Sequence, residues 1–545
     1  MKRRLTTILA LMLSIISTTQ AQDFESAKVA VKNMGVGWNL GNTLDACSGG
    51  AQGLESETYW GQPVTKPELM KMMKEAGFSA IRVPVTWYNH MDADGKVDEA
   101  WMKRVHEVVD YVIKQDLYCI VNVHHDTGDG SQWLHASTTT YNKVKTKFEY
   151  LWKQIASEFK DYDQKLLFES YNEMLDDNNR WNEPATDDGY KAINSYAKSF
   201  VTTVRNTGGN NKNRNLVVNV YSASSAPNAM KALELPENSG HIIFQMHTYP
   251  NWQNETNAKR EIDNLMSNIK SNLLNRAPVI IGEYATFTTW PSKIDYYDTN
   301  RKVALYAMDY LVKQAKAAGI ATFYWMGLSD GPHRSMPAFN QVDLAQTLIK
   351  AYYGSTDGYK YPTDDDYQTE YIVSYTSQWA ELFLYGDWNS TTAMKLSEYK
   401  SVRVEMDDDY SSKLQIKVYG DKNGDNYKEQ YTALTAGTNT STIDFDSNQI
   451  GSNFYRITLQ NVGDAVTARV KNAALIKTDG TEVPANISVG WGCTMTTESS
   501  RKTSIIPSIA NRQEQNDAIY NLAGQRVTNP QKGIYIRNGQ KYIAK

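Results

Sequence analysis

The chain has 545 residues, and its hydrophobic content of 41% and charged content of 22% are ordinary for a soluble globular protein. This length exceeds what one compact core can hold and predicts two or three domains. The formal net charge of −4 gives no electrostatic case for binding nucleic acid, whereas 13 Trp and 35 Tyr suit a protein that stacks flat ligands.

An export signal is predicted at residues 1–21. Basic residues at 2–4 precede a mostly apolar run at 5–16, and Thr-Gln-Ala at 19–21 offers a small-residue cleavage site. The apolar run is too short to span a bilayer, and no later stretch is long and apolar enough to do so. We therefore expect a secreted protein without a transmembrane segment.

Short apolar segments alternate with longer amphipathic ones between residues 35 and 327. Eight such units in about 300 residues predict a (β/α)8 barrel. A doubly wound open sheet would need a Gly-rich phosphate turn after the first strand, and Gly35, Gly37 and Gly41 lack that spacing. The predicted strands are 35–42, 80–87, 118–126, 166–173, 215–222, 242–250, 278–285 and 321–327.

Polar residues collect at the carboxyl ends of these strands, where barrel enzymes carry their chemistry. Two of the strands end in a glutamate, Glu173 and Glu283. Either one alone could equally be a salt-bridged strand end. Two carboxylates on the strand ends of one barrel are, however, the minimum equipment of a glycoside hydrolase, so the pair favours catalysis.

Seven motifs in chain order resemble glycoside hydrolase family 5 of clan A, over residues 31 to about 350, and most of all its endoglucanase and xyloglucanase branch. They are GVGWNLGNTLDA, ETYWGQPVT, AIRVPVTWYNHM, VNVHHD, FESYNEM, MHTYP and VIIGEYA. The resemblance implies that Glu173 is the acid/base and Glu283 the nucleophile. One departure is MGLSDG after Trp325, which leaves the substrate contacts at that edge open. The other residues that the resemblance places around the reacting sugar are Arg82, His124, Asn172, His247, Tyr249 and Trp325.

The physical chemistry of these side chains fits those roles. Carboxyl groups about 5–5.5 Å apart allow direct attack and retention of configuration. Arg82 and Tyr249 can hold Glu283 ionised by charge and hydrogen bonding, although Arg82 could instead pair with Glu169, or do both. Asn172 can bond the sugar 2-hydroxyl, and Trp325 offers an apolar face to a pyranose.

We expect no metal ion and no other cofactor. Cys47, Cys119 and Cys493 are too few and too scattered for a metal cluster or a disulfide framework. His124 and His125 together resemble metal ligands, but no third His or carboxylate stands at a metal-motif spacing.

Weaker candidates for substrate contacts surround the strand ends. Four tryptophans fall in loops after the third, fourth, sixth and seventh predicted strands, and such loops line the cleft of a barrel enzyme. Packing within the loop is the alternative for each of them. The weaker candidates are Asn39, His125, Trp133, Trp181, Trp252 and Trp290.

The composition changes at residue 361, where an acidic, proline-bearing break ends the helical periodicity. Period-two strands then predict a β-sandwich. It is either a carbohydrate-binding module, with Trp379, Trp388 or Trp491 stacking on sugars, or a buttress for the barrel. The blocks NLAGQRV and KGIYIRNG near the end resemble the type IX secretion sorting domain, although one last pair of sandwich strands is the alternative.

The expected protein is an endo-acting, retaining glycoside hydrolase that cleaves internal β-1,4-glucosidic bonds of cellulose-type glucans or xyloglucan. Xylanase, mixed-linkage glucanase, mannanase and a non-catalytic surface glycan-binding protein are the alternatives. Its partner would be plant cell-wall β-glucan, and we expect a monomer that is secreted or attached to the cell surface. The expected organisation is a signal peptide at 1–21, a catalytic (β/α)8 barrel at 22–360, a β-sandwich at 361–493, a linker at 494–512 and a β-rich sorting tail at 513–545.

Overall fold

The computed structural model describes residues 24–545 apart from 129–132, 250–251, 253, 288–294, 502–518, 521–525, 528–532, 538–539 and 545. The predicted export signal lies outside the described residues. By its internal contacts the chain divides near residue 500 into a large unit and a small C-terminal one.

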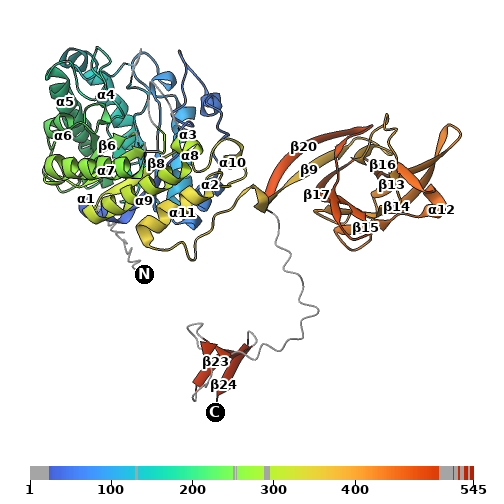
Figure 1. The fold of residues 1–545 in the computed structure, drawn as a ribbon. Coiled ribbons are helices and arrows are strands. Elements are labelled where there is room, and N and C mark those ends of the chain that lie inside the picture. The colour runs from blue at the N-terminus through green and yellow to red at the C-terminus, as the bar shows by residue number, and fades with distance from the viewer. Residues whose placement is uncertain are drawn as a thin grey trace, which may run out of the picture. The chain divides into compact units, whose positions relative to one another are not determined.

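The first part of the large unit is a closed barrel of eight parallel strands, which confirms the predicted fold class (Figure 1). The first strand pairs with both the second and the eighth, and this closes the barrel. The strands are shorter than predicted, because the polar residues at their ends belong to the loops that follow. The strands are β1 Val36–Asn39, β2 Ala80–Val83, β3 Tyr118–Asn122, β4 Leu166–Glu169, β5 Leu216–Asn219, β6 Ile242–Thr248, β7 Val279–Tyr284 and β8 Ala321–Trp325.

Helices connect the strands and surround the barrel (Figure 1). One of the amphipathic segments between the strands forms α3, whose first turn is capped by the Asp98 carboxylate on the amides of Ala100 and Trp101. No helix of the described residues is long and apolar enough to cross a membrane. The helices are α1 Ala27–Met34, α2 Pro67–Ala76, α3 Glu99–Ile113, α4 Thr138–Glu158, α5 Asp188–Asn206, α6 Pro227–Ala232, α7 Glu255–Ile269, α8 Tyr296–Thr299, α9 Arg301–Ala318, α10 Pro332–Ser335 and α11 Val342–Tyr353.

The interior of the barrel is apolar at one end and polar at the other. Side chains such as Ile120, Leu167 and Ile280 form a core that is shared with α1. Two residues beyond Ala80 and Leu167 on β2 and β4, Arg82 and Glu169 are fully buried within the barrel. Because parallel strands all point the same way, these polar residues form a layer directly below the carboxyl-end mouth.

Residues near the predicted barrel end at 360 contact the barrel. The amide of Phe339 donates a hydrogen bond of 2.8 Å to the carbonyl of Pro362, and the amide of Lys360 donates one of 3.0 Å to Glu75. These two bonds tie the segment 360–362 to the barrel.

Two sheets with a shared apolar core follow and form the predicted β-sandwich. One sheet has the strand order β14-β13-β16-β10-β19, with β11 paired to β16, and the other has the order β15-β12-β17-β9-β20, with β18 paired to β17. The elements are β9 Tyr367–Tyr375, β10 Glu381–Tyr385, β11 Met394–Lys395, β12 Tyr399–Met406, β13 Leu414–Asn423, β14 Asn426–Ala433, β15 Thr440–Asp444, α12 Ser447–Ile450, β16 Asn453–Asn461, β17 Val466–Lys477, β18 Glu482–Pro484, β19 Ser488–Val489 and β20 Cys493–Arg501.

The last strand of the sandwich differs from the prediction. Residues 494–512 were expected to form a linker, yet β20 continues through Arg501 beside β9. Its sequence TMTTESS is rich in threonine, a β-branched residue that favours strands, so Ser/Thr content alone was misleading.

The small C-terminal unit contains a four-stranded sheet in the order β22-β21-β23-β24. Its longest pairing is the antiparallel one of β23 with β24. The strands are β21 Ile519–Tyr520, β22 Arg526–Val527, β23 Gly533–Arg537 and β24 Gln540–Ala544.

Candidate active site

Arg82 of β2 organises the polar layer at the mouth of the barrel. Its guanidinium donates to both carboxylate oxygens of Glu169, at 2.6 and 2.7 Å, and to Oε1 of Glu283 at 2.6 Å. Arg82 therefore pairs with both Glu169 and Glu283, the two partners that the sequence offered. Burial opposes the charge, but Glu169 and Glu283 raise the pKa of Arg82 above its ordinary value. Although burial disfavours its charge, the pKa of Glu169 is lowered, chiefly by Arg82.

Glu283 lies inside β7 and is 4% exposed. Besides Arg82, the hydroxyl of Tyr249 donates to its Oε2 at 2.6 Å. Burial nevertheless raises the pKa of Glu283, while His247, Arg82 and Tyr249 act in the opposite direction. Both donors that we expected to hold Glu283 ionised do contact it, but the loss of water outweighs them.

Glu173 follows β4 in the loop and is joined to Glu283 through one imidazole. Nδ1 of His247 lies 2.9 Å from Oε1 of Glu173 and 3.5 Å from Oε2 of Glu283. A carboxylate oxygen of Glu173 lies within 4.8 Å of one of Glu283. The side chain of Glu173 is 22% exposed and that of Glu283 is 5% exposed. The two carboxyl groups are thus close together in different surroundings.

The protonation of His247 follows from its neighbours. Burial lowers the pKa of His247 to about 4, so the ring is neutral near pH 7. Nδ1 faces two carboxyl groups, which favours placing the single ring proton there. Nε2 then accepts from Nε2 of Gln245, 3.3 Å away.

Gln245 keeps this position because Gly282 has no side chain. A Cβ at Gly282 would lie 2.4 Å from the Gln245 side chain, well inside van der Waals contact. Sequence reasoning missed both residues. They lie on neighbouring strands β6 and β7, and nothing in either strand alone indicates that they touch.

Asn172 presents an N–H group to the mouth. Nη2 of Arg82 lies 2.8 Å from its Oδ1. Because a guanidinium can only donate, the amide oxygen must face Arg82. The Nδ2 group of Asn172 is then the donor that remains for a sugar hydroxyl.

Rings extend outward from Glu283 in a row. His124, whose Nε2 is 4.0 Å from Oε1 of Glu283, stacks on Trp325 with centroids 5.7 Å apart and planes 6° apart. His125 lies edge-on to His124, and Trp60 lies edge-on to His125 with a centroid distance of 5.1 Å. Trp60 is 38% exposed. Sequence reasoning missed Trp60 as a contact residue, although it stands within the motif ETYWGQPVT.

The tautomer of His124 is also set locally. Nδ2 of Asn122 lies 2.9 Å from Nδ1 of His124 and supplies the hydrogen of that bond. Burial holds the pKa of His124 well below its ordinary value, so the ring is neutral. Its proton is therefore on Nε2, on the side of Glu283.

The weaker candidates are placed in different environments. Asn39 is fully buried, accepts from Nη1 of Arg82 at 3.0 Å and donates to the carbonyl of Gly282 at 2.9 Å, so it positions Arg82 from below the mouth. Trp133 is partly buried and donates to Asp126 at 2.7 Å.

The two remaining described tryptophans differ sharply. Trp181 is 46% exposed and can present a ring to a ligand. Trp252 is fully buried in the barrel's apolar core, so it cannot contact a sugar at the surface, and loop position alone gave the wrong environment for it. Trp290 lies outside the described residues.

Two groups of side chains have the donor set of a metal site among the described residues. They are Asp45, His124 and His125, and Glu173, His247 and Glu283. In the second group, Nδ1 of His247 lies 2.9 Å from Oε1 of Glu173 and 3.5 Å from Oε2 of Glu283.

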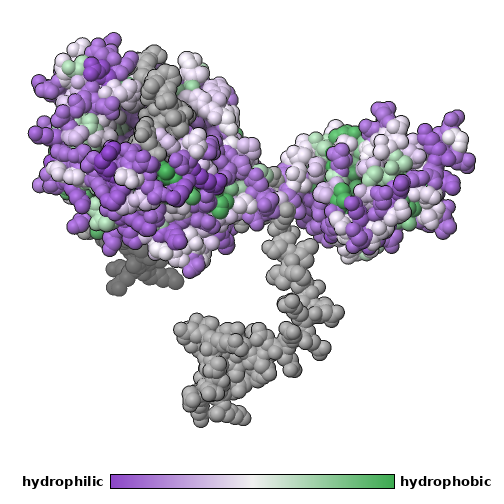
Figure 2. Space-filling view, in the orientation of Figure 1, coloured by the Kyte–Doolittle hydropathy of each residue, from purple (hydrophilic) through white to green (hydrophobic). Residues whose placement is uncertain are grey.

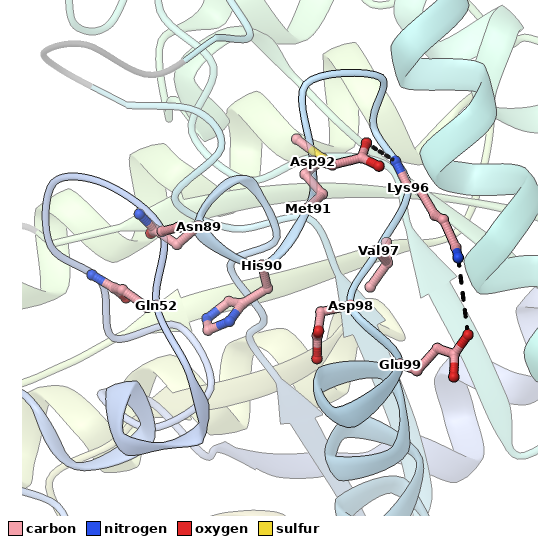
Figure 3. A pocket seen from close by; sticks show the side chains of 10 residues that line it. Gln52, Asn89, His90, Met91, Asp92, Lys96, Val97, Asp98 and Glu99 are labelled. Atoms are coloured by element: carbon pink, nitrogen blue, oxygen red, sulfur yellow. Dashed lines mark hydrogen bonds and ion pairs between the residues drawn. The ribbon is translucent and has the colours of Figure 1, made fainter.

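A pocket of about 490 Å³ opens elsewhere, between the loops that follow β1 and β2 (Figure 3). His90 at its wall stacks on Trp101 with centroids 3.6 Å apart, and Asp98 is occupied as the cap of α3. Neither Glu173 nor Glu283 lines it. The pocket is therefore separate from the carboxylate pair.

Comparison with known proteins relates the barrel to a family. The model of the family described as Cellulase (glycosyl hydrolase family 5) matches residues 44–330. Endoglucanase B of Neocallimastix patriciarum is 34% identical over 375 residues, which cover 65% of this chain and 76% of that protein. Endoglucanase A of Clostridium longisporum is 34% identical over 328 residues, and the match spans only 60% of its length.

Solved structures give the same relation. A GH5-4 broad specificity endoglucanase from an uncultured bacterium is 51% identical, with a TM-score of 0.59, and the match covers 61% of this chain and 96% of that one. A glycoside hydrolase family 5 enzyme from Prevotella bryantii, in complex with a xyloglucan tetradecasaccharide, is 43% identical with a TM-score of 0.58. The match covers 60% of this chain and 99% of that one.

Proposed function

The chain belongs to glycosyl hydrolase family 5 and is a glycoside hydrolase, and from that membership we propose that it is an endo-acting, retaining enzyme that cleaves internal β-1,4-glucosidic bonds of cellulose-type glucans or xyloglucan. The observation that carries the mechanism is the separation of the carboxyl groups. Oxygens of Glu173 and Glu283 within 4.8 Å match the short spacing of retaining glycosidases, since an inverting pair must leave room for a water molecule between the carboxyl groups.

Glu283 is the nucleophile in this proposal. Its oxygens accept from a guanidinium and a phenol, and both contacts favour the ionised form that attacks the anomeric carbon. Glu173, which is more exposed and faces the leaving group, gives its proton to the glycosidic oxygen. In the second step Glu173 takes a proton from water, and that water releases the sugar from Glu283.

The surrounding residues bind and orient the sugar. Nδ2 of Asn172 donates to the 2-hydroxyl, a contact that strengthens as the oxocarbenium-like transition state forms. Trp325 is held face to face with His124 and offers its other side to the pyranose ring. Trp60 and His125 extend this row and suit a further sugar of the chain.

The substrate is proposed from the relatives. Several are called endoglucanases, one is described as having broad specificity, and one was solved with a xyloglucan oligosaccharide. Plant cell-wall β-glucan is the polysaccharide we propose. A xylanase, mixed-linkage glucanase or mannanase would use the same two carboxyl groups, so a panel of polysaccharides separates these alternatives. An endo mode requires the viscosity of xyloglucan to fall well before reducing sugar accumulates.

The roles of the two glutamates are tested with azide. Glu283→Ala should be nearly inactive on every substrate, because no covalent intermediate can form. Glu173→Ala should keep its first step on aryl glycosides with good leaving groups, which need little protonation. Azide should then give a β-glycosyl azide with Glu173→Ala and the α-product with Glu283→Ala. Exchanged products would reverse the assignment, and net inversion by the unaltered enzyme would refute double displacement.

We also propose that residues 513–545 are a type IX secretion sorting tail and that the protein is secreted or attached to the cell surface as a monomer. The sequence blocks NLAGQRV and KGIYIRNG support this proposal. Deletion of 513–545 should leave an active enzyme in the periplasm of its host. Ordinary amounts in the medium or at the surface after the deletion would contradict it.

A further inference from the structure

The sheet β14-β13-β16-β10-β19 carries aromatic residues on its outward face. Its pairing aligns Tyr431, Lys417, Thr458, Phe383 and Ser488 in one row across the five strands. The neighbours of these residues along each central strand, such as leucines and isoleucines of β10, β13 and β16, point into the sandwich core. Because side chains alternate along a strand, the row faces away from that core.

Trp388 lies over this face and is held in a fixed position. The guanidinium of Arg456 is 4.4 Å from the centroid of the Trp388 ring and 3.9 Å from that of Tyr419. The Trp388 ring also lies edge-on to Phe383, 5.6 Å away. These contacts order the ring, and the guanidinium covers one of its faces. Trp388 remains 50% exposed.

Two further rings at the margins of the face are similarly exposed. Tyr431 on β14 is 48% exposed, and Trp491, just after β19, is 58% exposed. The backbone of Trp491 accepts a hydrogen bond from Glu381 of β10, which fixes it beside the sheet. Four strand spacings of about 4.8 Å put these margins roughly 19 Å apart. Figure 2 shows hydrophobic residues reaching the surface of the part of the chain that carries these strands.

A buried polar network lies beneath the rings. Oε1 of Glu381 accepts from Tyr419 and from Gln460, each at 2.8 Å. Oε2 of Glu381 and Nε of Arg456 are buried without a hydrogen-bond partner among the described residues. These groups are buried, so they support the rings from below and do not themselves reach the surface.

The outward face of the other sheet is different. Arg403 of β12 pairs with Glu482 at 2.6 Å, and Arg469 of β17 pairs with Glu370 at 3.0 Å. The Arg403–Glu482 pair is partly exposed, as is ordinary for a solvated face, whereas Glu370 is buried. The concentration of rings is therefore a property of one sheet and not of the sandwich as a whole.

We propose that the outward face of β14-β13-β16-β10-β19 binds a β-glycan chain, with Trp388 as the central stacking ring and Tyr431 and Trp491 beside it. Flat, exposed rings suit the C–H faces of pyranoses. The proposal goes beyond the proposed function, because binding at this face needs neither Glu173 nor Glu283.

The test uses the full chain with Glu173→Gln, so that the polysaccharide is not cleaved. Affinity electrophoresis in gels containing xyloglucan or barley β-glucan measures binding. Adding Trp388→Ala or Tyr431→Ala should weaken binding by at least about tenfold, as for aromatic residues at the centre of a binding site. Arg403→Ala, on the other sheet, is the matched control and should bind like its parent.

Activity separates this face from the catalytic mouth. In the chain with Glu173 intact, Trp388→Ala should leave kcat/KM on an aryl cellobioside unchanged, and thermal unfolding should confirm that the sandwich is folded. Retardation equal to that of the parent in both Trp388→Ala and Tyr431→Ala would overturn the proposal. Concentration-dependent dimers that Trp388→Ala abolishes would also overturn it, in favour of an interface between copies. Failure of the catalytic proposal would leave these binding measurements unaffected.

Discussion

Replacing Tyr249 by Phe should move the acid limb of the pH–rate profile. The hydroxyl of Tyr249 donates to Oε2 of Glu283 at 2.6 Å, and this bond stabilises only the ionised carboxyl group. Burial already raises the pKa of Glu283, so removing a donor favours the protonated, inactive form still further. A hydrogen bond to a charged group contributes about 1.5–3 kcal/mol, and 1.36 kcal/mol corresponds to one pH unit. The midpoint of the acid limb of the kcat/KM profile should therefore move to higher pH by about one to two pH units.

The assay is kcat/KM on an aryl cellobioside across the acid range, where the free enzyme's ionisations govern the rate. Tyr284→Phe is the matched control, because the Tyr284 hydroxyl lies 3.4 Å from that of Thr322 and not beside Glu283. Its profile should keep the acid limb of the unaltered enzyme. An unmoved limb in Tyr249→Phe, with a lower plateau, would refute the reasoning, because it would mean that Tyr249 orients the substrate and does not stabilise the Glu283 charge.

Two further substitutions probe the layer below the mouth. Arg82→Met should abolish activity and lower the free energy of unfolding by about 3–5 kcal/mol, because it leaves two buried carboxyl groups without a cation. In urea titrations this deficit should shrink as the pH falls. The reason is that the lowered pKa of Glu169 stabilises the unaltered protein only while that carboxyl group is ionised. A deficit independent of pH would contradict the charge argument. Gly282→Ala should displace Gln245 and lower kcat by about ten- to a hundredfold with the fold retained. Gly49→Ala, whose Cβ would meet nothing within 4 Å, should have no effect, and an active Gly282→Ala would show that Gln245 does not position the site.

The barrel could be predicted because each strand is a short apolar run that ends in polar residues. Strand ends were less predictable, since Asn172 and Glu173 continue the sequence pattern of β4 but lie beyond Glu169, where pairing stops. This difference does not affect the site, because a residue just past a strand still reaches the mouth of the barrel.

Contacts between strands were the part that sequence could not supply. Arg82 had two plausible carboxylate partners, and only the structure shows that its three nitrogens reach both. Gln245 and Gly282 depend on the register of β6 against β7, which no single-strand pattern encodes. The prediction that Trp252 could contact substrate was wrong for a related reason, because a loop residue can point inward and pack into a core formed by other segments.

The shared imidazole of His247 links the two steps of the proposed reaction. While Glu283 is ionised, its negative charge within 4.8 Å favours the protonated form of Glu173, the form that the first step needs. Once Glu283 carries the sugar as an ester, that charge is gone, and Glu173 is free to become the base that the second step needs. Nδ1 of His247 lies 2.9 Å from Glu173 and 3.5 Å from Glu283, so one N–H group is within reach of both carboxyl groups. The neutral state of His247 is essential to this exchange, because a permanent positive charge would favour the ionised form of Glu173 at the moment when it must hold a proton.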